Sequence, residues 1–249
     1  MNTKTEYIKS ISIIIAFVVS AIILGNAIQR FKNEDRYISV KGFSEKEVKA
    51  DLVIWTIKIR VADNELIKGN SNLESLKAKV TDFLVTKGVA KTEINSLDIL
   101  VIDNQANEYN ANITNRMRYI IEETIEVRSN NVELIQKISR MTNELLNAGV
   151  ALSTKSDWRG SGLQFIFTKL NTIKPQMITE AIKNAKDAAI QFTRESDTKL
   201  GKLRKANQGL FSIQDRDETF SSEEGFPRNG TSGVMKKVRV VLSVDYSIE

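Results

Sequence analysis

The C-terminal segment Val234–Ile248 constrains the fold most, because apolar and polar side chains alternate along its whole length. Successive side chains of a β-strand point to opposite faces, so this pattern predicts a strand with one buried and one solvated face. Residues 52–61 alternate in the same way, with Val53, Trp55, Ile57 and Ile59 on one face. Such strands are typical of antiparallel sheets that are covered on one side only.

Three other segments space their apolar residues as amphipathic helices do. The first covers residues 64–87 and is followed by Gly88 as a helix C-cap. The second begins at a cap among Ser129, Asn130 and Asn131 and ends at Gly149, and the third begins at Pro175 and ends at Gly201. The alanine-rich face of the third helix predicts close packing against a neighbour.

Shorter alternating runs predict further strands between these elements, and polar stretches predict loops. We therefore expect an α+β fold with mostly antiparallel sheets and three amphipathic helices, preceded by one N-terminal hydrophobic helix. The further strands are expected at Ile38–Gly42, Leu97–Asp103, Met117–Arg128, Ala151–Thr154, Leu163–Thr168 and Gly209–Ile213, and the main polar loops at Asn104–Asn115 and Asp215–Gly233.

The N-terminus contains no charged residue between Lys9 and Arg30. Twenty helical residues extend about 30 Å, the thickness of the hydrocarbon core of a bilayer. We predict a signal-anchor or transmembrane segment in residues 1–30, which contacts the membrane through residues 10–29. A charged linker at 31–37 and one α+β domain at 38–249 follow.

Two outcomes of export remain open. The first is a single-pass protein of the bacterial inner membrane, with the domain in the periplasm or otherwise outside the cytoplasm. The alternative is a protein secreted to the periplasm after cleavage near Ala27, where small residues occur at suitable offsets. In both cases we expect the domain to work in the cell envelope.

The composition excludes several classes of function. The chain has neither cysteine nor histidine, so disulfides, thiolate nucleophiles, imidazole bases and imidazole metal ligands are absent. The net charge of +5 is the small difference between 36 basic and 31 acidic residues. Because the basic residues are not clustered along the sequence, we expect no nucleic-acid partner.

A few residues are candidates for ligand binding. Glu123 stands on the otherwise apolar face of a predicted strand, where it is either a perturbed buried acid or a residue at the rim of the sheet. We favour the rim, because buried glutamate is rare. Trp158 and Arg159 are able to stack on a ligand, although core packing is the simpler role for Trp158.

Other polar motifs favour structural roles. Arg118, Glu122, Glu126 and Arg128 are expected to form a solvated sheet face with cross-strand ion pairs. Gly160-Ser-Gly162 is followed by a strand, which indicates a turn or bulge and not a phosphate-binding loop. The acidic residues that begin at Asp215 lack the order of a calcium loop. We expect no catalytic, cofactor-binding or metal-binding residues.

The order of these motifs resembles the SIMPL-domain family, which includes proteins like the periplasmic immunogenic protein. The resemblance rests on a strand ending at Gly42, a helix ending at Lys87-Gly-Val89 and a second helix ending at Ala148-Gly149. The resemblance also includes an alanine-rich helix that leads to Leu200-Gly201-Lys202, and the final strand. It covers residues 38–248. Phe43 departs from the family, where many members have a small residue.

The resemblance implies an exported or membrane-anchored bacterial envelope protein that forms homo-oligomers, some members being ring-shaped. A link to envelope or oxidative stress is suspected for such proteins, and the resemblance provides no catalytic motif. We therefore expect a non-enzymatic, self-assembling protein. The alternative is a small-ligand binder or carboxylate-based enzyme with a pocket near Glu123 and Trp158.

Overall fold

The computed structural model of the chain describes residues 17–25, 36–106, 117–152, 162–217 and 232–248. These residues divide into two compact units. Unit 1 contains the chain up to Lys46, together with Ile173–Ser212 and the chain from Arg239 onward. Unit 2 contains Glu47–Thr172 and Ile213–Val238.

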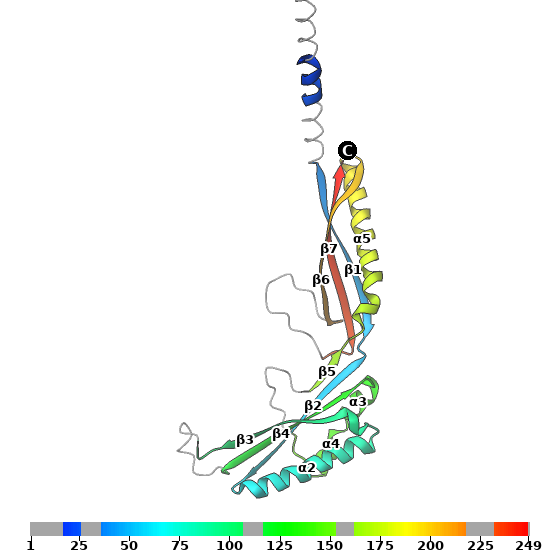
Figure 1. Cartoon of the computed structure of the whole chain (residues 1–249). Coiled ribbons are helices and arrows are strands. Elements are labelled where there is room, and N and C mark those ends of the chain that lie inside the picture. Colours follow the sequence, from blue (N-terminus) through cyan, green and yellow to red (C-terminus); the bar gives the residue numbers. More distant parts are fainter. Residues whose placement is uncertain (1–16, 26–35, 107–116, 153–161, 218–231, 249) are drawn as a thin grey trace, which may run out of the picture. The chain divides into compact units, whose positions relative to one another are not determined.

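Unit 1 is built on a three-stranded sheet in the order β1 (Tyr37–Lys49), β7 (Met235–Ile248) and β6 (Leu200–Asp215). Helix α5 (Leu170–Glu195) lies along one face of this sheet (Figure 1). The alternation predicted for the last strand is confirmed, because Val238, Val240, Leu242, Val244 and Tyr246 are buried while the residues between them are partly exposed. Because β7 lies between β1 and β6 in the sheet, it is the central strand, and both of its backbone edges are paired within the chain.

Gly42 sets the distance between β1 and α5. A Cβ atom added to Gly42 would lie 2.1 Å from the carbonyl oxygen of Ala181 and 2.7 Å from Cβ of Ala185. Ala181, Ala185 and Ala189 are fully buried, as the alanine-rich face predicted. The first strand was expected to end at Gly42, but it continues to Lys49. The glycine is required for this helix–strand approach and does not end the strand.

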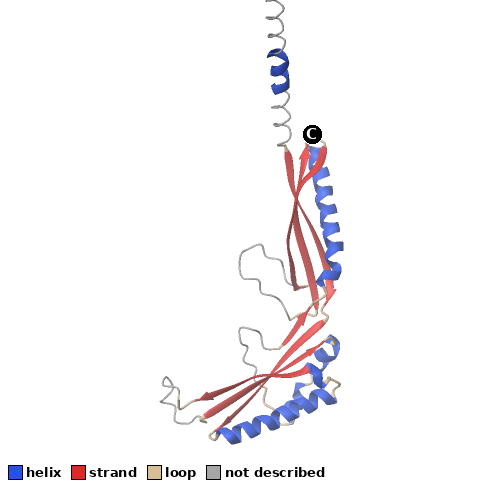
Figure 2. Ribbon diagram, viewed as in Figure 1, coloured by secondary structure: helices blue, strands red, loops and turns tan. Residues whose placement is uncertain are grey.

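Unit 2 contains a four-stranded antiparallel sheet in the order β3-β4-β2-β5, with its helices on one face (Figure 2). The strands are β2 (Leu52–Asp63), β3 (Ile94–Asp103), β4 (Tyr119–Ser129) and β5 (Leu163–Ile166), and the helices are α2 (Leu66–Thr86), the 3-10 turn η1 (Lys91–Glu93), α3 (Val132–Ser139) and α4 (Thr142–Asn147). The apolar face predicted for β2 faces the core, since Val53, Trp55, Ile57 and Ile59 are buried. The α+β class with antiparallel sheets is thus confirmed.

Several predicted boundaries differ from the structure. The second predicted helix is capped by Asn131, whose Oδ1 accepts a hydrogen bond from the Leu134 amide at 3.1 Å, but it breaks into α3 and α4 near Arg140. Helix α5 begins at Leu170, so Pro175 lies inside it, and it ends at Glu195 instead of Gly201. A proline near the start of a helix removes one backbone hydrogen bond, and the longer helix tolerates that loss.

Other differences concern the strands and the N-terminus. β6 is far longer than the predicted Gly209–Ile213. Of the predicted strand Ala151–Thr154, the described part contributes a single bridge between Leu152 and Ile59. A helix occupies residues 17–25, inside the predicted membrane segment. No helix in the described part of the chain is long and apolar enough to cross a membrane, and the rest of residues 10–29 lies outside that part.

Substituting Gly42→Ala tests the approach of α5 to β1. We expect a lower free energy of unfolding by about 1–3 kcal/mol, because the new methyl group meets the backbone of α5 and forces the helix outward. Lys41→Ala, at the adjacent exposed position, is the control and should change stability by no more than about 0.5 kcal/mol. Urea unfolding followed by circular dichroism measures both, and equal stabilities would contradict the assignment.

Candidate functional site

Glu123 is buried in the middle of the sheet of unit 2. It has no exposed surface, and its register partners are Ile59 on β2 and Ile99 on β3. Because β4 lies between two strands and α2 packs against its inner face, Glu123 is not at the edge of the sheet. The rim interpretation is therefore wrong, and the carboxylate is held inside the apolar layer.

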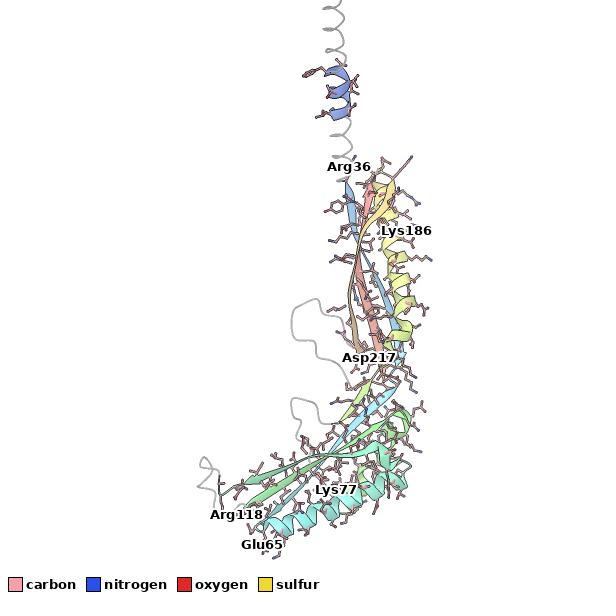
Figure 3. All side chains as sticks on the ribbon, in the orientation of Figure 1. Arg36, Glu65, Lys77, Arg118, Lys186 and Asp217 are labelled. Atoms are coloured by element: carbon pink, nitrogen blue, oxygen red, sulfur yellow. The ribbon has the colours of Figure 1, made fainter. Side chains whose placement is uncertain are left out.

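Two side chains reach one oxygen of this carboxylate. Nζ of Lys77, on α2, lies 2.7 Å from Oε1 of Glu123, and the hydroxyl of Ser96, on β3, donates a hydrogen bond to the same atom. The pKa of Lys77 is raised, because the hydrogen bond to Glu123 outweighs the opposite effect of partial burial. Lys77, which is labelled in Figure 3, is thus positioned to neutralise a buried carboxylate. Oε2 of Glu123 has no hydrogen-bond partner among the described residues.

A β-bulge brings Ser96 to this position. Ser96 pairs with Ile125 while Ile99 pairs with Glu123, so β3 contains one residue more than the facing part of β4. Bulges of this kind redirect side chains at sheet edges. The resulting cluster of Lys77, Glu123 and Ser96 is chemically an ion pair with a hydroxyl donor, and the second oxygen of the Glu123 carboxylate is able to accept a hydrogen bond from a further donor.

The other ligand candidates cannot be joined to Glu123. Trp158 and Arg159 lie outside the described residues, as does Gly160. A pocket that combines Glu123 with Trp158 therefore stays a prediction. Gly162 is described, and its φ of +132° is consistent with the expected turn or bulge.

The outer face of β4 carries the expected cross-strand ion pairs. Arg60 on β2 lies opposite Glu122, with Nη2 2.6 Å from Oε2. Arg118, just before β4, pairs with Asp103 at 3.2 Å. Such exposed pairs add little stability. The interpretation of this surface as a solvated sheet face is supported, and no group of three or more acidic residues able to hold a metal ion occurs in the described ranges.

A second buried ion pair was missed by the sequence analysis. Asp215 was placed in a solvated acidic loop, but it ends β6 with 7% of its surface exposed. Lys236, the lysine that interrupts the apolar face of the last strand, is 2% exposed and donates a hydrogen bond to Asp215. That interruption was the available indication, because a lysine among buried valines requires an acidic partner.

Asp215 also fixes the backbone where the chain returns to the sheet. The amides of Ser232 and Gly233 donate hydrogen bonds to its Oδ2 at 3.1 and 2.9 Å. Burial alone raises the pKa of Asp215, but the hydrogen bonds from Lys236, Gly233 and Ser232 together outweigh burial and lower it. The carboxylate therefore links the end of β6 to the start of β7, and we call this set of hydrogen bonds the Asp215 clasp.

The edge strand β3 exposes an apolar surface. Leu97, Ile99, Leu100 and Val101 are between 45% and 55% exposed. Helix α2 packs against β2 and β4, and the register places Ile99 and Val101 on the same side of the sheet as Glu123 and Ile121. These two side chains thus lie on the helix-bearing face but beyond the cover of the helix. Exposed apolar edges of this kind are typical of interaction surfaces.

Comparison with known proteins gives one family match. The SIMPL model, described as a protein of unknown function (DUF541), matches residues 38–245, which are most of the chain. A comparison with curated proteins found no match. The matched range includes every strand of both sheets except Tyr37 at the start of β1 and the last three residues of β7.

Replacing Lys77 tests the buried ion pair. Lys77→Met should lower the free energy of unfolding by about 1–3 kcal/mol, because the buried carboxyl group of Glu123 then loses its cationic hydrogen-bond partner. Adding Glu123→Gln should recover part of the loss, which a double-mutant cycle measures. Lys68→Met removes an exposed ion pair with Glu65 on the same helix and should cost no more than about 0.5 kcal/mol. Additive effects of the two core substitutions would contradict the pairing.

Acid unfolding tests the Asp215 clasp. A carboxyl group with a lowered pKa stabilises the fold above its unfolded pKa, and that contribution is lost as the pH falls through the folded pKa. Asp215→Asn should therefore be less stable near neutral pH and lose less stability between about pH 6 and pH 3. The control Asp217→Asn alters an exposed neighbour. Urea unfolding at several pH values gives the free energy of unfolding as a function of pH, and these plots should be parallel for this control and the unmodified chain.

Proposed function

Because the chain belongs to the SIMPL family, whose function is unknown, we propose that it is a non-enzymatic, membrane-anchored bacterial envelope protein. Its SIMPL domain works outside the cytoplasm and associates with a second copy through β3. The observation that carries this proposal is the exposed apolar surface of that edge strand. The 20 uncharged residues between Lys9 and Arg30 support the anchor.

The edge of β3 is suited to association. In the described chain β3 pairs only with β4, so its other backbone edge is open to another strand. Soluble proteins usually protect such edges with charged side chains, proline, bulges or very short strands. In β3 the bulge contains Asp98 and the strand ends at Asp103, but the segment Ile99–Ile102 between them has no charged residue and no proline. Its bulge lies at Ser96–Ile99, and the straight segment after it is the most apolar part.

The position of β7 changes the basis of the oligomer hypothesis. By its sequence alone, the long alternating strand Val234–Ile248, which contains no proline or glycine, is compatible with either an unprotected edge that associates with another copy or a central position in the sheet. The central position is the one observed. β3 therefore replaces β7 as the proposed interface, and the resemblance to ring-forming proteins supports a second copy as the partner. The number of copies in the oligomer depends on the angle at which two copies meet, which the β3 edge alone does not define.

Ligand binding near Glu123 is the second candidate. It is favoured by one observation, the buried Oε2 atom without a partner among the described residues. Oε1 is already occupied by Lys77 and Ser96, as in a structural ion pair. We rank this candidate second because a core ion pair needs no ligand to explain it.

The mass of residues 37–249 in solution tests the interface. We expect light scattering at micromolar concentration to give a mass above that of one chain. Ile99→Lys combined with Val101→Lys should return it to one chain, because charged edge side chains oppose strand pairing. Leu210→Lys, which replaces a 93% exposed leucine on β6, is the control and should leave the mass unchanged. A single-chain mass at all concentrations would refute the proposed association, and circular dichroism verifies folding.

A further inference from the structure

The start of β6 carries a basic surface that the proposed function does not use. Between Thr198 and Gln214 there are four basic residues and no acidic one, a short local cluster that the small overall charge excess does not reveal. All four are exposed: Lys199, Lys202, Arg204 and Lys205. Strand β6 is at an edge of its sheet, and residues 202–210 are exposed on both faces, so α5 does not cover them. We call Lys199, Lys202, Arg204 and Lys205 the basic edge.

Backbone contacts place the basic edge at the end of the sheet where β1 begins. The amide of Ile248 donates to the carbonyl oxygen of Arg36 at 3.2 Å, and the amide of Lys202 donates to Oγ of Ser247 at 2.8 Å. Arg36, directly before β1, the last residues of β7 and the start of β6 therefore meet at one end of unit 1. Arg36 is labelled at this end in Figure 3.

Aromatic and aliphatic side chains accompany the charges. The guanidinium group of Arg204 lies 5.5 Å from the centre of the Tyr37 ring, so these residues share the sheet face opposite α5. Tyr37 and Leu203 are 56% and 57% exposed. Tyrosine beside lysine and arginine is the composition found at membrane–water interfaces. Glu195 and Asp197, at the end of α5, reduce the local positive charge without removing it.

The distance to the predicted anchor is short. The uncharged segment ends at Arg30, and seven residues from Arg30 to Arg36 extend at most about 25 Å when fully stretched. If the segment spans the bilayer, the linker keeps the basic edge within reach of the headgroups. Electrostatic attraction to anionic lipid decays over about 8 Å at physiological salt, so the edge must approach the surface to bind, and the short linker permits that approach.

We propose that the basic edge binds the anionic phospholipid headgroups of the membrane that holds the anchor, with Tyr37 at the interface. This inference rests on the anchoring part of the proposed function. It assigns the β6 edge to lipid and the β3 edge to the second copy. The partner is identified by charge complementarity and by the length of the linker.

A reporter on β6 tests the contact in the full chain. The chain has no cysteine, so Ala206→Cys gives a single labelling position beside the basic edge. The labelled chain is reconstituted in nanodiscs that contain a headgroup quencher, either in phosphatidylcholine alone or with phosphatidylglycerol. We expect at least about twofold stronger quenching with the anionic lipid, reversed by high salt.

Matched charge variants identify the residues responsible. Substituting Gln at Lys202, Arg204 and Lys205 should abolish the dependence on anionic lipid. The control substitutes Gln at Lys91, Lys137 and Arg140, which are three exposed basic residues of unit 2, and should retain it. The circular dichroism spectra of both variants should match that of the parent chain.

The outcomes separate the two proposals. Co-flotation with vesicles after carbonate washing, without any effect of anionic lipid on quenching, would leave the anchor standing and overturn the lipid contact. Loss of co-flotation would refute the anchor, and the lipid inference would fail with it. Quenching that changes with the number of chains per disc, and not with lipid charge, would assign the basic edge to contact between copies and overturn the inference.

Discussion

In both units, a helical layer narrower than the sheet determines what is buried and what is exposed. A helix with its side chains is about 10 Å wide, whereas adjacent strands are spaced by almost 5 Å, so one helix covers about two strands. In unit 1, α5 packs closely on β1 at Gly42, and β6 lies beyond its cover. In unit 2, α2 packs on β2 and β4, and β3 lies beyond it. Both proposed interaction surfaces follow from this limited coverage.

The uncovered strands differ in chemistry, which suggests different partners. β3 exposes Leu97, Ile99, Leu100 and Val101, and burial of such side chains is favourable against another protein. β6 exposes lysine and arginine beside tyrosine, and such side chains remain solvated at a lipid headgroup. The family match leaves function open, so these surfaces supply the basis for the proposals.

The buried ion pairs limit the alternatives that each sheet can adopt. Lys77 with Glu123 links α2 to β4, and Asp215 with Lys236 links β6 to β7. A shift of one residue in either strand would leave a charge buried without its partner, which is costly. We therefore regard the pairs as devices that specify register, a hypothesis that the double-mutant cycle and the acid unfolding experiments address.

The sequence by itself determined the α+β class, the inner face of β2, the alternation of β7 and the alanine-rich packing face of α5, because side-chain periodicity is a local property. Tertiary structure decided the rest. Gly42 was interpreted as a strand end because the helix that needs it is about 140 residues away in the sequence. Glu123 and Asp215 were assigned to the surface because their partners, Lys77 and Lys236, reach them only when distant segments pack together. Whether β7 or β3 was an open edge was likewise fixed by strand order, which no local pattern contains.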